Sequence, residues 1–207
     1  MGWVFDPAHT TVGFSARHMG LSTVRGRFTR FNGTIELDPD ELTKTRGRVE
    51  VDMASVDTGD EKRDAHLRSP DFFDVENYPV MVFVPKTVTP EGDGTYRVTG
   101  ELTIKGITRE VELKYEHGGE ATDPYGNRKM GGRLTGTIKR SDWGLRWNVA
   151  LETGGWLVSD KINIEVEGQV AGAQCFSAPS PPWATQLARH RYRGMSYPLG
   201  SPYPRRM

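Results

Sequence analysis

The chain has 207 residues, with 27 lysines and arginines against 27 aspartates and glutamates, so its formal net charge is zero. This length favours a single domain that buries a core without disulfide or metal support, and the balanced charge excludes a uniformly basic nucleic-acid binder. The single cysteine, Cys175, excludes an intrachain disulfide and the usual cysteine-rich zinc sites.

The N-terminal segment carries Asp6 and His9 where a signal peptide needs an unbroken apolar stretch. No run in the chain approaches the roughly 18 consecutive apolar residues of a transmembrane helix. We therefore expect a cytoplasmic globular protein.

Up to residue 172, apolar and polar residues alternate with the period of antiparallel strands that have one buried face. In the segment Thr95–Ile104, for example, Val98 and Leu102 share an apolar face, while Arg97 and Glu101 share a polar one. The same pattern predicts strands near residues 2–6, 10–18, 22–37, 46–56, 79–89, 94–105, 107–117, 130–141 and 160–171, the first two either separate or merged.

The run from residue 22 to residue 37 is too long for one unbent strand, and Gly26 and Gly33 are the expected positions of a bulge or corner. Turn sequences such as Lys105-Gly106 separate the later strands. Roughly eight long, half-buried strands close most easily into a barrel, because closure removes exposed sheet edges. The fold we predict is all-β: an antiparallel up-and-down β-barrel of about eight strands.

Residues 60–68 interrupt the alternation with good helix formers, and Pro70 ends the segment. We expect a short helix here, followed by an aromatic loop, and together they fit a lid over one mouth of the barrel. The charged residues of this helix have two interpretations. They dock the lid through capping and ion pairs, or they contact a ligand; the residues concerned are Arg63, Asp64, His66 and Arg68.

The sequence contains none of the motifs of a hydrolase nucleophile elbow, a phosphate-binding loop, a dinucleotide site after a strand or a zinc protease. No two histidines are closer than nine residues, so we expect no metal site and no cofactor. His18 is in phase with Val12 and Phe14 and should point into the barrel. It is either a buried neutral imidazole bonded to a backbone carbonyl or a polar contact for a ligand headgroup.

The last part of the chain differs in composition. Residues 173–207 hold five arginines, no acidic residue and six of the 13 prolines, and their apolar residues show no sustained period. Such a segment buries too little surface to offset its ordering entropy. We place a domain boundary near Gly172 and expect residues 173–207 to be mostly disordered, with a weak helix over 184–191 as an alternative.

Several segments together resemble the YceI-like polyisoprenoid-binding family. They are Trp3-x-x-Asp6-x-x-His9, VGFSARHMG, VRGRFTRFNGTI, RDAHLRSPDFFDVENYP, VTGELTIKGITREVEL and the RSDWGL block. The resemblance runs from about Gly2 to about Gly172. It implies a lipocalin-like barrel with an elongated apolar tunnel that binds a long isoprenoid chain or another amphiphile without catalysis. Many members of this family are exported. The Arg-rich tail after Gly172 lies outside the family pattern.

On this basis residues 1–172 form the lipid-binding barrel, and its inward side chains line a continuous tunnel of at least ~300 Å³. Val111 and Ile138 belong to this inward set. The predicted ligand-binding residues are Val12, Phe14, His18, Phe28, Phe31, Val51, Met53, His66, Phe72, Phe73, Phe83, Val98, Leu102, Leu113, Trp143, Ile162 and Ile164. From the residues alone, the aromatic members either fill the barrel or line a cavity for one small ligand.

The predicted function is non-catalytic binding, storage or transport of a long-chain isoprenoid or similar amphiphilic lipid. The first alternative is a small enzyme acting on a quinone-like or fatty substrate, with His18 or His66 as acid–base. The second is an adaptor whose basic tail binds a membrane or nucleic acid, although five arginines over 35 residues are few for that role. We expect no nucleic-acid partner; transient membrane contact and a homodimer are both compatible with the sequence.

Overall fold

The computed structural model describes residues 2–152 and 154–172, so the expected tail and its boundary fall at or beyond the end of the described residues. The strands in this part of the chain are β1 (Gly2–Phe5), β2 (Thr11–His18), β3 (Ser22–Phe28), β4 (Phe31–Glu36), β5 (Arg46–Asp52), β6 (Val56–Asp57), β7 (Val80–Gly92), β8 (Thr95–Ile104), β9 (Ile107–Thr122), β10 (Arg128–Lys139) and β11 (Val158–Gly172). The α-helix is α1 (Glu61–Arg68), and the 3-10 turns are η1 (Pro7–His9), η2 (Leu42–Lys44), η3 (Met53–Ser55) and η4 (Arg140–Trp143). Over the described residues, no helix is long and apolar enough to span a bilayer.

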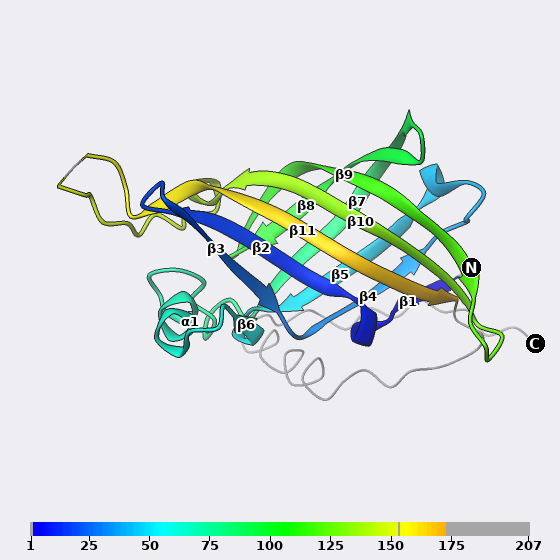
Figure 1. The fold of residues 1–207 in the computed structure, drawn as a ribbon, viewed down its shortest axis with the longest axis horizontal. Coiled ribbons are helices and arrows are strands. Elements are labelled where there is room, and N and C mark those ends of the chain that lie inside the picture. The colour runs from blue at the N-terminus through cyan, green and yellow to red at the C-terminus, as the bar shows by residue number, and fades with distance from the viewer. Residues whose placement is uncertain (1, 153, 173–207) are drawn as a thin grey trace, which may run out of the picture. The chain divides into compact units, whose positions relative to one another are not determined.

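Eight of these strands close a barrel. They pair in the order β1, β4, β5, β7, β8, β9, β10 and β11, and β11 pairs again with β1. On the edge opposite β10, strand β11 is long enough to pair with two strands: Val170–Gly172 pairs with β1, while the stretch from Val158 to Glu167 pairs with β2. The β2–β3 hairpin therefore extends the wall beyond the closed ring, as Figure 1 shows. The predicted antiparallel barrel is confirmed.

The corner in the first half of the chain lies at Thr29 and Arg30, between β3 and β4, and the prediction of Gly26 or Gly33 was wrong. Ser55 forms the corner from outside the strand. Its carbonyl accepts from the Thr29 amide at 3.2 Å and its hydroxyl accepts from the Arg30 amide at 3.0 Å. Because Ser55 of η3 satisfies these two amides, they need no partner in a neighbouring strand. Before the corner β3 pairs with the short β6, and after it β4 pairs with β5.

The predicted helix is confirmed as α1, and its N-cap is Asp60, whose carboxylate accepts from the Arg63 amide at 3.0 Å. The helix is held to the barrel by side chains that bond to backbone. Arg68 Nε donates to the carbonyl of Ala54 at 2.9 Å, and Asp64 accepts from the Thr58 amide at 2.9 Å. The interpretation that ion pairs dock the helix was therefore wrong for these two residues. Arg68 and Asp64 instead form hydrogen bonds to the backbone just before and just after β6, in the lower left of Figure 1.

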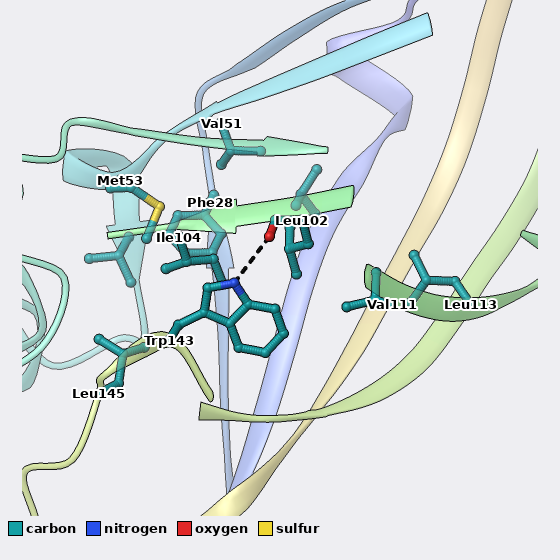
Figure 2. Packing of buried hydrophobic residues seen from close by; sticks show 11 residues of the cluster. Phe28, Val51, Met53, Leu102, Ile104, Val111, Leu113, Trp143 and Leu145 are labelled. Carbon is teal, nitrogen blue, oxygen red and sulfur yellow. Dashed lines mark hydrogen bonds between the residues drawn. The ribbon is translucent and has the colours of Figure 1, made fainter. Parts of the chain in front are cut away.

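Two apolar clusters fill the two ends of the barrel. The larger one surrounds Trp143, Met53 and Leu102 near α1, and Figure 2 shows its packing. The second cluster lies at the opposite end and consists of Trp3, Leu37, Leu42, Met130 and Val170, with Trp3 only 1% exposed. The space between the clusters is where a ligand site can form.

Candidate functional site

The interior of the barrel holds a cavity of about 720 Å³. This volume lies within the roughly 300–1,000 Å³ of small-molecule sites and exceeds the expected lower limit. Aliphatic side chains from β2, β8, β10 and β11 line it, including Val12, Leu102, Ile138 and Ile164. Ile164 faces inward yet is only half-buried, because the space in front of it is hollow rather than packed.

The structure brings nearly all the predicted site residues to this cavity. Every predicted residue except Trp143 lines it, namely Val12, Phe14, His18, Phe28, Phe31, Val51, Met53, His66, Phe72, Phe73, Phe83, Val98, Leu102, Leu113, Ile162 and Ile164. Val111, expected to point into the tunnel, is 7% exposed and belongs to the packed cluster beside it.

Trp143 is a core residue instead of a wall residue. Its side chain is 2% exposed, and its indole Nε1 donates to the carbonyl of Leu102 at 3.1 Å, the dashed line in Figure 2. Leu145 packs beside it, and Gly144 between them has a φ of 73°, which the glycine adopts without strain. The RSDWGL block therefore seals the wall near α1.

Glycines on neighbouring strands make room for aromatic rings on the cavity wall. A Cβ atom added to Gly26 would lie 2.5 Å from Cζ of Phe14, its direct partner across β2 and β3. A Cβ atom at Gly100 would lie 2.7 Å from Cε2 of Phe83. Each ring thus lies against the wall over a glycine instead of standing out into the lumen. The glycines keep the barrel hollow despite its many aromatic residues.

The second cluster forms the floor of the cavity. Leu37, Leu42, Met130 and Val170 all line the cavity at this end. Behind them, the indole Nε1 of Trp3 donates to the carbonyl of Leu37 at 3.3 Å. The floor is therefore well packed and mainly apolar, with Thr45, Tyr115 and Gln169 as polar lining residues beside it.

The α1 end of the cavity is covered by aromatic side chains. The His66 ring meets the Trp147 ring edge-on, with centroids 4.5 Å apart, and Phe72 packs against both. His66 Nε2 lies 3.0 Å from a carboxylate oxygen of Asp71. Phe73 reaches Phe28 with a centroid distance of 6.0 Å. The helix and its aromatic loop cover this end as the expected lid.

His18 lies at the end of β2 on the cavity wall and is half-buried. Among the described residues its imidazole makes no hydrogen bond. The interpretation of His18 as a core histidine bonded to a backbone carbonyl therefore finds no support in the geometry. The side chain is available to a polar group in the cavity.

Sequence reasoning missed Arg140 and Trp147. Arg140 is 5% exposed and lines the cavity; it donates to the carbonyls of Leu145 at 2.5 Å, Trp147 at 2.9 Å and Ser159 at 3.1 Å. Burial lowers the pKa of this guanidinium from its ordinary value. Arg140 lies in the predicted strand over residues 130–141, in phase with the inward Ile138, so the alternation could have indicated its direction. Trp147 lies just after the RSDWGL block, where the alternation has stopped.

The chemistry of the cavity wall is limited. Asp60 is the only carboxylate residue on the wall in the part of the chain that the structure describes, and it caps α1. The amide of Arg63 lowers the pKa of that carboxyl by its hydrogen bond. Within residues 2–152 and 154–172, no group of three histidine, cysteine or acidic side chains is arranged to hold a metal ion. The wall offers mainly apolar surface, with polar side chains near both ends, such as His18 near α1 and Tyr115 near the second cluster.

The family model for the YceI-like domain matches residues 3–170. A UPF0312 protein of Staphylococcus aureus (strain MSSA476) is 34% identical over 168 residues, which are 81% of this chain and 95% of that protein. A solved YCEI protein of Campylobacter jejuni has a TM-score of 0.67 and 33% identity, covering 76% of this chain and 90% of that one.

A solved domain from Saccharophagus degradans, described as polyisoprenoid binding and implicated in plant cell wall breakdown, has a TM-score of 0.60 at 15% identity. It covers 83% of this chain and 98% of that domain, and at this identity the likeness shows the fold alone. The family match spans nearly the whole barrel, and the Staphylococcus relative is similar over nearly its full length. The chain therefore belongs to the YceI-like family.

Proposed function

We propose that the protein binds a long-chain isoprenoid or similar amphiphilic lipid in its barrel cavity and releases it unchanged, as a store or carrier. The observation that carries the proposal is the cavity of about 720 Å³ with its almost wholly apolar wall. The Saccharophagus domain of the same fold is described as polyisoprenoid binding, which agrees with this ligand class.

Burial of the apolar chain supplies enough free energy for binding. An isoprene unit has about five carbons, so burying one is worth roughly 4 kcal/mol at about 0.8 kcal/mol for each carbon group. Three or four buried units offset an association cost of ~4–15 kcal/mol. Affinity therefore comes from the chain, and the headgroup needs only a few polar contacts.

We place the headgroup at the α1 end. His18, His66 and Arg140 all line the cavity there, whereas the opposite end is the apolar floor around Leu37 and Met130. A headgroup at the floor would find fewer free polar partners, because the Tyr115 hydroxyl beside the floor already donates to the carbonyl of Gly131. At the α1 end, an oxygen of the headgroup can accept a hydrogen bond from His18.

The enzyme alternative rests on His66, which lines the cavity and has one carboxylate neighbour. The carboxylate beside His66 belongs to Asp71, which does not line the cavity, and His18 has no carboxylate within hydrogen-bonding distance in the described part of the chain. A general acid–base pair acting on a bound substrate would need such a partner within reach.

The proposal is tested by native mass spectrometry of the protein purified from its own source, followed by extraction of the bound lipid. We expect a mass adduct that extracts into organic solvent as an intact long-chain amphiphile. Incubation of the loaded protein should leave the lipid chemically unchanged. A protein that purifies empty and does not bind long-chain isoprenoids or fatty probes in titration would refute the proposal.

A further inference from the structure

Two loops at the α1 end of the barrel carry exposed apolar side chains. Met19 and Leu21 lie on the turn between β2 and β3 and are 43% and 79% exposed, while Val149 and Trp156 lie on the loop before β11 and are 45% and 61% exposed. We call these four residues the apolar tip. In the described part of the chain, the only other large apolar side chains so exposed are Val4, Tyr78 and Tyr125.

The two loops are built structures that hold one another. The Met19 amide donates to the carbonyl of Leu157 at 2.8 Å, and the Leu157 amide donates to Val149 at 2.9 Å. The Asn148 side chain closes the second loop by bonding both the amide and the carbonyl of Val158. The tip is therefore one contiguous feature, and its apolar side chains are presented to the outside by a hydrogen-bonded frame.

The tip borders the lidded end of the cavity. Three residues beside the tip line the cavity: His18 at the end of β2, Leu157 on the second loop and Val158 at the start of β11. The other end of the barrel is closed by the floor around Trp3. A lipid that leaves the cavity past these residues reaches the apolar tip first.

We propose that the apolar tip inserts into the surface of a lipid bilayer and sets the cavity mouth against the membrane. This inference rests on the proposed lipid-binding function. Four side chains on two loop tips offer far less than the roughly 800 Å² per partner of a stable protein interface, whereas they suit insertion between lipids. A tryptophan beside aliphatic residues is also the composition favoured at the membrane–water interface.

The charges around the tip favour a membrane only modestly. Arg17 and Arg146 are exposed next to the two loops, and Glu152 is exposed on the second loop. Apolar insertion therefore dominates the attraction. Binding should be stronger on anionic vesicles than on neutral ones, but it should not require them.

The test compares the full chain with the double variant Leu21→Ser/Trp156→Ser in vesicle co-flotation. The control is Tyr125→Ser, which removes an apolar side chain that is 90% exposed on the β9–β10 turn instead. Vesicles are made of phosphatidylcholine alone or mixed with phosphatidylglycerol. We expect the double variant to lose at least tenfold in vesicle affinity and the control to match the wild type. The five arginines of residues 173–207 are present in all three proteins, so the difference reports the tip alone.

Three outcomes would overturn the proposal: a wild type that does not bind vesicles, equal binding by the double variant, or a dimer that the double variant loses in size exclusion. The last would identify a second copy as the occupant of the tip. Titration with a fluorescent fatty acid in solution separates this proposal from the function itself. The double variant should bind that probe with wild-type affinity. If the wild type binds vesicles but not the probe, the proposed lipid binding in the cavity is refuted, while membrane insertion of the apolar tip is supported.

Discussion

Replacing Gly26 with alanine tests whether glycines hold the cavity open. The new methyl group would lie 2.5 Å from Cζ of Phe14 and 2.8 Å from Cγ2 of Thr58. Carbon atoms pack at about 3.5–4.0 Å, so the Phe14 ring must move by roughly 1 Å or more. Since the other side of the ring faces the cavity, the lumen is the direction open to it.

We expect this overpacking to cost about 1–3 kcal/mol of unfolding free energy. For a chain of this size, each kcal/mol lowers the melting temperature by ~2–4 °C. The displaced ring should also narrow the cavity and weaken binding of a long-chain fluorescent lipid. Both effects are measured on one sample, by thermal unfolding and by titration.

The matched control is Gly131→Ala on β10, where a Cβ atom would meet only the carbonyl oxygen of Gly168 at 3.5 Å, an ordinary contact. The double variant Gly26→Ala/Phe14→Leu provides the second check, because a smaller side chain relieves the clash. Its cost should be clearly less than the sum of the two single costs. Additive costs, or a Gly26→Ala variant as stable and as tightly binding as the control, would refute the reasoning.

Three further predictions concern the headgroup, the tail and acid stability. His18→Leu should weaken binding of a chain with its polar headgroup by roughly 1–2 kcal/mol while barely changing binding of the bare hydrocarbon; equal weakening of both in titration, with a lower melting temperature, would make His18 a structural residue. Truncation after Gly172 should leave the melting temperature and lipid binding unchanged because the barrel strands are complete there, and a loss of several degrees would place the tail on the body. The hydrogen bond from Lys129 lowers the pKa of Asp6, so the stability advantage of the wild type over Asp6→Asn should be full above the unfolded pKa of about 4 and fall as the pH drops through the lower folded pKa; melting curves that differ equally at all pH values would contradict it.

The sequence by itself determined the elements whose residues interact locally or repeat with a simple period. Alternation placed β8 and β11 within one or two residues of their observed bounds, and Lys105-Gly106 marked a turn in which both residues have positive φ. The helix α1 was also predictable, because Asp60 caps an amide only three residues away. The same alternation pointed almost all the predicted ligand-binding side chains inward.

Only the tertiary structure decided the features that depend on partners distant in the chain. The corner at Thr29 and Arg30 depends on Ser55, and Trp143 became a core residue because its indole reaches the carbonyl of Leu102, 41 residues away. Arg140 is buried because three backbone carbonyls converge on it, which no local pattern reports. Whether the barrel was filled or hollow depended on register: Phe14 lies over Gly26 only because β2 and β3 pair at that residue, so the ring rests on the wall and leaves the lumen open.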